Sequence, residues 1–307
     1  MGRDWGSSLS VLFCFPMLKL KAYAKLDLAI DIFPKKLSSG FFPVHYIDTQ
    51  MDLSDELTFE SLREEIRVVC KNPELSGERE NFVYKTAVAL RKIVGREDLG
   101  AEINLLKNIP IRAGFGGGSS DGAATVLGLS KLWKVKVSQK QIRNLSRDLG
   151  KDFFYSIYGG LSEVLGKGND YKVTPIKSKL PDFWLLLAVP KSTKPSTGWV
   201  YENLKKSDLG RNSAKIKKLK TALLKRDKMG ICENLTNDFE PFVSSKFPVV
   251  SDLKEAFLRS GALAAIMAGA GLSVVGFFES KEATEIVRTK LLSMKSVRQI
   301  LISRIKS

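Results

Sequence analysis

A glycine-rich run in the middle of the chain constrains the fold more than any other feature. The stretch IPIRAGFGGGSSDGAAT (residues 109–125) places four glycines between Gly114 and Gly118 and then becomes alanine-rich and helix-like. Glycines cost backbone entropy, so such a run indicates that the backbone closely approaches another group. A turn that leads into a helix presents free N–H groups and the positive end of the helix dipole, which together bind anions. The alternative is an ordinary flexible turn before a helix.

The two common nucleotide-binding templates do not fit this run. The P-loop pattern G-x-x-x-x-G-K-[ST] fails because no lysine follows the glycines. The dinucleotide pattern G-x-G-x-x-G fails because Gly114, Gly116 and Gly118 have the wrong spacing. Anion binding is therefore predicted without a class of ligand.

Length and composition indicate a globular protein of one large or two ordinary domains. The chain has 307 residues, of which 44% are hydrophobic and 27% charged. Its three cysteines, Cys14, Cys70 and Cys232, lie far apart, which favours a reducing, cytoplasmic setting over a disulfide framework. The single histidine, His45, argues against a zinc site and leaves one candidate base for a serine hydrolase.

The net charge of +16 raises the possibility of a nucleic-acid partner. Much of the basic charge lies between Lys205 and Lys228, where Ile216, Leu219 and Leu223 form the apolar stripe of a predicted helix. A solvated helix face explains this pattern best, because no aromatic residue is interleaved with the charges as in single-strand binding grooves. A basic protein also suits polyphosphate ligands.

The N-terminal segment SSLSVLFCFPML is apolar but lacks a basic region before it and is too short to span a bilayer. We expect Met17 to be the natural start, residues 1–16 to be an extension, and no membrane partner for the chain.

Periodicity predicts the main elements. Residues 18–32 alternate apolar and polar, which predicts a strand with one buried face and places Lys25 and Asp27 together on the other. Helical spacing marks residues 83–94 and 121–133, and Ser138 with Gln141 forms a capping box for a third helix that ends before Asp152. A polar, proline-bearing stretch then predicts a boundary between domains 17–178 and 179–307, the second alternating strands and helices.

Several motifs, in order, resemble those of the GHMP kinases. The run PIRAGFGGGSSD is similar to their phosphate loop, P-x-x-x-G-L-G-S-S-A, and closer to the P-x-x-A-G-L-G-G-G-S-S of one branch. AYAKLDL, IDTQMDLSDELTF, LGKDFFYSIYGG, PSTGWVYENL, LTNDFE and MAGAGLSVVGFF resemble further motifs of that branch, so the resemblance covers roughly residues 18–278. It implies an α/β (α+β) two-domain fold, with an ATP-loop domain followed by a smaller α/β domain.

The same resemblance implies a reaction and a set of site residues. ATP with Mg²⁺ would phosphorylate the 2-hydroxyl of a cytidine diphosphate-linked methylerythritol, a small molecule of the non-mevalonate isoprenoid pathway. Asp152 matches the catalytic base and Lys25 the catalytic lysine, Ser120 is a candidate Mg²⁺ ligand, and Asp27 matches a substrate-binding position. The ATP phosphates would be held by Pro110, Ile111, Arg112, Ala113, Gly114, Phe115, Gly116, Gly117, Gly118, Ser119 and Ser120. Without the resemblance, Lys25 and Asp152 could equally be surface charges.

The chain departs from this pattern at the acceptor site. Asp27 replaces an asparagine, and Phe41-Phe42 replace a Tyr-His pair that, with a later tyrosine matched by Tyr201, surrounds the cytosine. His45 is either a substitute for that histidine or, as we favour, an ordinary strand residue. Ala268 and Ala270 replace Ser or Thr of the third glycine motif. A GHMP kinase for homoserine or mevalonate, or a basic nucleic-acid-binding protein, remains an alternative, and a monomer or homodimer is expected.

Overall fold

Two long antiparallel strands, β1 (Leu18–Ile32) and β2 (Val44–Arg63), form the centre of the protein. The computed structural model describes residues 17–75, 81–168 and 170–306, so the expected extension at residues 1–16 lies outside the described part of the chain. The strand predicted over 18–32 is confirmed. Its predicted one-sided burial is wrong from Ala24 to Ile32, where both faces are buried. Strands of the C-terminal half cover the apolar face, and helix α4 reaches the charged face through Lys151.

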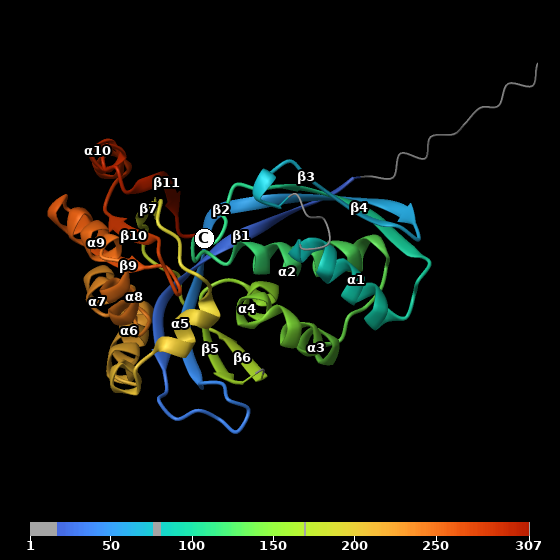
Figure 1. Ribbon diagram of the computed structural model, residues 1–307, viewed down its shortest axis with the longest axis horizontal. Coiled ribbons are helices and arrows are strands. Elements are labelled where there is room, and N and C mark those ends of the chain that lie inside the picture. The colour runs from blue at the N-terminus through green and yellow to red at the C-terminus, as the bar shows by residue number, and fades with distance from the viewer. Residues whose placement is uncertain (1–16, 76–80, 169, 307) are drawn as a thin grey trace, which may run out of the picture.

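The first sheet has the strand order β3-β4-β2-β1-β8, and β5 continues it from the other half of β2 and pairs with β6. Its remaining strands are β3 (Ile66–Cys70), β4 (Leu99–Leu106), β5 (Ser162–Lys167), β6 (Asp170–Pro175) and β8 (Thr236–Asn237). Helices α1 (Phe82–Val94) and α2 (Gly117–Leu132) lie against one face of this sheet, with α3 (Gln139–Leu149) and α4 (Lys151–Tyr158) beyond them (Figure 1). The capping box of Ser138 and Gln141 is confirmed, and the helix predicted from residue 121 begins four residues earlier, inside the glycine run.

The second sheet belongs to the C-terminal half and has the order β11-β7-β10-β9. Its strands are β7 (Trp184–Pro190), β9 (Ala264–Met267), β10 (Val274–Phe278) and β11 (Val297–Arg304). Most helices of this half gather at the end of the molecule away from α1, while α5 lies nearer the middle (Figure 1). They are α5 (Thr197–Asn203), α6 (Ser213–Lys225), α7 (Lys228–Glu233), α8 (Glu240–Lys246), α9 (Val249–Arg259) and α10 (Lys281–Leu292), and short 3-10 turns span Pro73–Leu75 and Lys206–Asp208.

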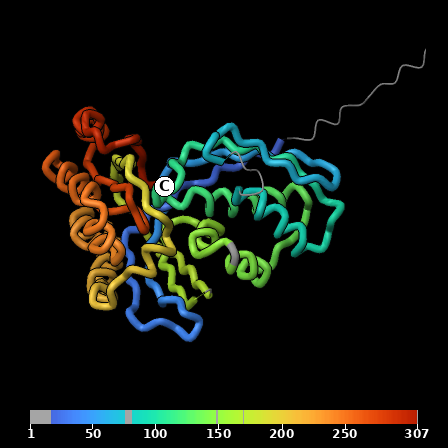
Figure 2. Tube along the Cα trace, in the orientation of Figure 1, coloured from blue at the N-terminus to red at the C-terminus, as the bar shows by residue number. Residues whose placement is uncertain are grey.

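The N-terminal and C-terminal halves of the chain are joined by strand pairing and by a common hydrophobic cluster. The short strand β8 pairs in parallel with β1 of the first sheet, and the end of the chain returns to the middle of the molecule, where Ile305 bridges to Met51 (Figure 2). One hydrophobic cluster contains Leu26 and Leu28 of β1 together with Leu185 and Leu187 of β7. Strand β6 of the first sheet ends at Pro175, and β7 of the second sheet begins at Trp184. The domain boundary expected at residue 178 falls between these two strands and stays a prediction.

The basic segment forms α6, and its apolar stripe of Ile216, Leu219 and Leu223 is buried as predicted. Among the described residues, none of the helices combines the length and apolar character needed to cross a bilayer.

Candidate active site

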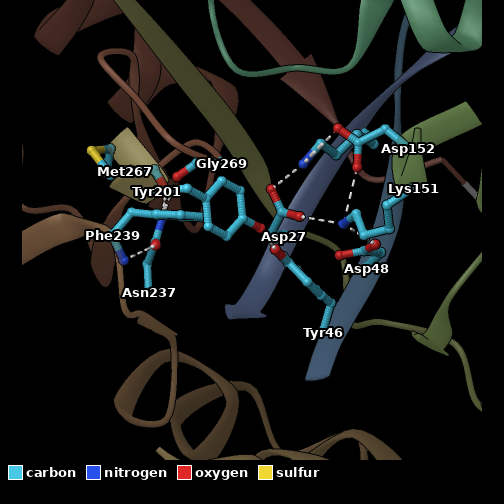
Figure 3. Close-up of polar contacts among 11 residues, drawn as sticks. Asp27, Tyr46, Asp48, Lys151, Asp152, Tyr201, Asn237, Phe239, Met267 and Gly269 are labelled. Carbon is cyan, nitrogen blue, oxygen red and sulfur yellow. Dashed lines mark hydrogen bonds and ion pairs between the residues drawn. The ribbon is translucent and has the colours of Figure 1, made fainter. Parts of the chain in front are cut away.

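Five ionisable side chains meet where β1, β2 and the start of α4 come together, and Figure 3 shows Asp27, Asp48, Lys151 and Asp152 among them. Lys25 and Asp27 come from β1, Asp48 from β2, and Lys151 and Asp152 from the first turn of α4. Lys25 is only 4% exposed and Asp27 only 1%. Buried charges are rare unless they are paired, so this cluster is a built feature of the fold and not a solvated surface.

Lys25 stands between two carboxylates. Its ammonium group donates a hydrogen bond to Oδ2 of Asp27, and it lies 3.6 Å from Oδ2 of Asp152. The alternation of β1 predicted that Lys25 and Asp27 lie close together, because residues two apart in a strand share a face. The contact between Asp152 and Lys25, in contrast, depends on tertiary packing. The structure therefore brings together the two residues assigned to catalysis.

Lys151 is a site residue that the sequence analysis missed. Its ammonium lies 3.0 Å from Oδ1 of Asp152, 3.1 Å from Oδ2 of Asp48 and 3.4 Å from Oδ1 of Asp27. It also lies 3.5 Å from the ring centroid of Tyr46, a cation–π distance. A lysine in the first turn of a helix normally faces solvent, and its adjacency to Asp152 was the one signal in the sequence.

The lysines control the ionisation of the carboxylates. Burial alone would raise the pKa of Asp152, but the charges of Lys151 and then Lys25 outweigh it and hold that pKa well below its usual range. The pKa of Asp27 is also lowered, since Lys25 and Lys151 outweigh its burial. Burial dominates at Asp48 and raises its pKa to about 8. Asp152 is thus ionised at neutral pH, whereas burial favours the protonated form of Asp48.

The glycine run packs directly against Lys25. The backbone N–H of Lys25 donates to the carbonyl of Phe115 at 2.9 Å, which joins β1 to the loop. Gly116 has a φ of 67°, and a Cβ there would lie 2.7 Å from Cγ of Lys25. Gly116 is the N-cap residue of α2, and no side chain caps this helix start. The first N–H groups of a helix lack intrahelical partners, so the loop presents backbone donors beside the charged cluster.

Ser120 lies in the first turn of α2 and is buried. Its hydroxyl donates its proton to the carbonyl of Tyr23 at 2.8 Å, which leaves only oxygen lone pairs for another partner. Within the described ranges, no group of three or more His, Cys, Asp or Glu side chains could hold a metal ion. Mg²⁺ commonly uses one or two protein oxygens together with substrate phosphates, so this donor set fits a phosphate-bound ion.

A second ionic cluster, formed by Lys107, Asp55 and Asp121, holds the glycine run in place. Lys107 hydrogen-bonds to Asp55 and lies 2.8 Å from Oδ2 of Asp121, the residue that follows the two serines. Oδ1 of Asp55 accepts from the backbone N–H groups of Asn108 and Ile109 at 2.6 and 2.8 Å. Burial raises the pKa of Asp121 to about 8. These contacts tie the end of β4 and the start of α2 to β2, and so fix both ends of the glycine run.

A cavity of about 310 Å³ lies beside the start of this run. It is lined by residues 107–111, by Asn72 and Glu74, and by Arg298 and Gln299. Its position next to the loop suits a group attached to bound phosphates.

The aromatic residues assigned to the acceptor meet only in part. The rings of Phe42 and Tyr201 stack with centroids 6.4 Å apart and planes 19° apart. The hydroxyls of Tyr201 and Tyr46 lie 3.0 Å apart (Figure 3), and Phe239 packs edge-on against Tyr201. Phe41, in contrast, is 52% exposed and stays outside this group. The sequence analysis did not assign Tyr46 or Phe239, whose contacts with Tyr201 come from tertiary packing.

His45 is a residue of β2, as favoured above, and its Nε2 lies 2.7 Å from Oε1 of Glu163. The third glycine motif, around Ala268, packs against the glycine run at Gly114. The contact is close, since a Cβ at Gly114 would lie 2.3 Å from the carbonyl oxygen of Ala268. Asn237 holds this turn through hydrogen bonds to the carbonyls of Met267 and Gly269 (Figure 3). Asn237 also was not assigned from sequence.

This combination of a glycine loop before a helix, two sheets and a Lys–Asp pair defines the class of protein, and comparisons with known proteins agree. The chain matches the GHMP kinases N terminal domain over residues 81–165 and the GHMP kinases C terminal domain over residues 219–295. A solved structure titled as a 4-(cytidine 5'-diphospho)-2C-methyl-D-erythritol kinase superposes with a TM-score of 0.77 at 24% identity, covering 94% of this chain and 100% of its own. A homoserine kinase from Cytophaga hutchinsonii superposes at 0.71 with 19% identity, covering 95% of this chain and 96% of its own.

Sequence similarity is more specific than the shared fold. A 4-diphosphocytidyl-2-C-methyl-D-erythritol kinase from Geobacillus thermodenitrificans is 35% identical over 264 residues, which cover 85% of this chain and 88% of that protein. The chain therefore belongs to the 4-diphosphocytidyl-2-C-methyl-D-erythritol kinase family of GHMP kinases. The α/β two-domain GHMP kinase fold is confirmed, and the chain is a phosphotransferase of an ATP-dependent class. The homoserine and mevalonate alternatives are correspondingly weaker.

Proposed function

We propose that this chain transfers the γ-phosphoryl group of ATP to the 2-hydroxyl of 4-diphosphocytidyl-2-C-methyl-D-erythritol, a step of non-mevalonate isoprenoid synthesis. The observation that carries the proposal is the position of Lys25, which contacts the Asp152 carboxylate on one side and the glycine loop on the other. A phosphoryl acceptor and a phosphate donor would meet there. The cytoplasmic location and the monomeric or dimeric state remain predictions.

The proposed chemistry needs little covalent work from the protein. The acceptor hydroxyl oxygen attacks the γ-phosphorus, the bond to the β–γ bridging oxygen breaks, and ADP leaves. Asp152 takes the hydroxyl proton; its Oδ1 is buried against Lys151, so Oδ2 is the oxygen that faces this task. A carboxylate with a lowered pKa is a weak base, which suffices because phosphoryl transfer depends chiefly on positioning and charge stabilisation. Lys25 supplies positive charge at the same point.

The loop from Pro110 to Ser120 would hold the phosphates through its backbone N–H groups and the N-terminus of α2. The cavity beside residues 107–111 would then receive the base of ATP. Mg²⁺, bound with the phosphates and with the oxygen of Ser120, would neutralise charge on the phosphate oxygens.

For the acceptor, the stacked rings of Phe42 and Tyr201 offer a platform for a pyrimidine base. Base–aromatic stacking contributes about 1–3 kcal/mol per base. Asp27 would act chiefly through Lys25 and Lys151, because both of its oxygens lie at these ammonium groups.

ADP formation should be measured with the purified chain, ATP and Mg²⁺ against three acceptors: the cytidyl substrate, homoserine and mevalonate. We expect turnover with the cytidyl substrate alone and a product that carries one added phosphoryl group on the 2-hydroxyl, assigned by phosphorus and proton NMR. Turnover with homoserine or mevalonate, and none with the cytidyl substrate, would overturn the assignment.

A further inference from the structure

The charged cluster of the site contains one more buried ammonium than phosphoryl transfer by Lys25 and Asp152 requires. Lys151 has a side chain that is 12% exposed, and three carboxylate oxygens lie within 3.4 Å of its Nζ. Two of these contacts, to Asp27 and Asp48, are hydrogen bonds, and the third, to Oδ1 of Asp152, is an ion pair. The ring of Tyr46 covers a further side of the group. Lys151 is therefore engaged by the protein itself and not held free for a ligand.

Asp27 creates the need for this second cation. It is fully enclosed, and its two oxygens are divided between the two lysines: Oδ2 accepts from Lys25 and Oδ1 lies 3.4 Å from Lys151. With Lys25 alone, the negative charge of Asp27 would neutralise the ammonium that has to face the phosphoryl group and Asp152. Two lysines among three carboxylates, one of which burial favours in its protonated form, leave the cluster close to neutral.

We propose that Lys151 is a positioning residue that offsets the buried charge of Asp27 and thereby keeps Lys25 and Asp152 in their catalytic charge states. The inference rests on the proposed function for its kinetic readout but concerns a different residue pair. Lys151 touches Oδ1 of Asp152, the buried oxygen, and so acts on the base from the side opposite to the substrate.

Loss of Lys151 should change how turnover depends on pH. The titratable groups that interact with Lys151 are Lys25 and Asp27 from β1, Tyr46 and Asp48 from β2, Tyr155 from α4, Tyr171 from β6 and Tyr201 from α5, besides Asp152 itself. The charge of Lys151 is the strongest influence that lowers the pKa of Asp152. Without Lys151 that pKa rises, and the acidic limb of the kcat profile moves to higher pH. A side chain that served only to fill space would not move this limb.

The test compares four variants with the wild type: Lys151→Met, Lys151→Arg, Asp27→Asn, and the double variant with Lys151→Met and Asp27→Asn. Lys167→Met, an exposed lysine on β5, is the matched control and should behave as wild type. We expect Lys151→Met to lower kcat at least 100-fold and to shift the acidic limb upward by one pH unit or more. Lys151→Arg keeps the charge and should lose less than 10-fold. Adding Asp27→Asn to Lys151→Met should restore at least 10-fold.

If Lys151→Met folds poorly, thermal unfolding measures the same coupling between Lys151 and Asp27. The double variant should then have a higher unfolding temperature than Lys151→Met. Wild-type kcat and an unmoved acidic limb in Lys151→Met would overturn the inference. It would equally be overturned if the double variant were neither more active nor more stable than Lys151→Met. Inactivity of the wild type on the cytidyl acceptor would count against the proposed function instead, since the stability coupling is measured without substrate.

Discussion

At the scale of single residues, the site is an arrangement of buried charge. Burying an ion pair costs desolvation energy that the mutual attraction of its members only partly offsets, so stability alone does not explain five ionisable groups in one place. The side chain of Asp152 keeps 29% of its surface exposed, whereas Asp27 and Asp48 are enclosed. The cluster thus presents one carboxylate to a ligand and surrounds it with fixed charge, the arrangement that electrostatic catalysis requires.

Lys25 and Asp152, the two residues proposed for catalysis, give the most direct prediction. Asp152→Asn keeps the shape of the side chain but removes the proton acceptor, and Lys25→Met removes the ammonium between the loop and Asp152. Each should lower kcat by about 100-fold or more, the usual scale for the loss of a positioned acid or base. ATP affinity measured by calorimetry should persist in Asp152→Asn. Near wild-type turnover in Asp152→Asn would show that another group, with Asp27 the first candidate, accepts the proton.

Recognition of the cytosine is the second prediction at this scale. Phe42 retains the stacking surface but cannot form the hydrogen bond of a histidine, whose loss costs about 1 kcal/mol or more. We expect kcat/KM for the cytidyl and uridyl acceptors to differ little in the wild type, and Phe42→His to increase the preference for cytosine about fivefold or more. A strong cytosine preference in the wild type that Phe42→His leaves unchanged would place base recognition in backbone contacts.

At the scale of elements, neighbouring residues pack tightly against the glycine loop. A Cβ at Gly116 would collide with Lys25, and one at Gly117 would lie 3.0 Å from Ile109. At Gly116 and Gly117 the loop therefore has no room for side chains, which is the condition for backbone N–H groups to approach phosphates there.

We predict that Gly116→Val and Gly117→Val abolish ATP binding in calorimetry with little change in circular dichroism. Gly198→Ala in α5 is a suitable control, because its new Cβ would meet Ser196 at an ordinary 3.6 Å. Normal ATP affinity in both valine variants would remove the phosphate-loop interpretation.

The cluster of Lys107, Asp55 and Asp121 should make the stability of the protein depend on pH. Lys107→Met leaves Asp55 and Asp121 buried without their cation, which should destabilise the protein by about 3–5 kcal/mol. Because the pKa of Asp121 in the folded protein is about 8, against about 3.9 for an aspartate in an unfolded chain, the folded state binds an extra proton between these pH values. Stability from this group therefore falls as pH rises from about 4 to 8, and the loss in Lys107→Met should be larger at pH 8 than at pH 5. Urea unfolding measures it, with the exposed Lys131→Met as control; an equal loss at both pH values would contradict the role of Asp121.

At the scale of the whole molecule, the two halves are interlocked. The chain crosses back when β8 pairs with β1 and again when the residues after β11 reach β2, where the N–H of Lys306 donates to the carbonyl of Gln50 at 2.9 Å. The apolar cluster around Leu26 and Leu28 is completed by the second sheet. The third glycine motif, from the C-terminal half, also packs against the glycine loop of the N-terminal half.

We therefore predict that the fragment 17–178 does not fold by itself, because one face of its central strand pair would expose large apolar side chains to water. The fragment should bind a hydrophobic dye and unfold without a cooperative transition, whereas the full chain unfolds cooperatively. A sharp thermal transition in the fragment would show that the predicted boundary separates independent domains.

The sequence by itself determined those features whose causes are local. Alternation along residues 18–32 specified the strand and paired Lys25 with Asp27, a capping box specified the start of α3, and steric freedom at four glycines specified the loop. Ordered motifs specified the family. Only the tertiary structure decided that Lys151 is buried among carboxylates, that Phe42 and not Phe41 stacks on Tyr201, and that both faces of β1 are covered. Burial and pairing of this kind depend on which distant segments pack together, and the spacing of neighbours along a chain does not encode the electrostatic environment that such packing creates.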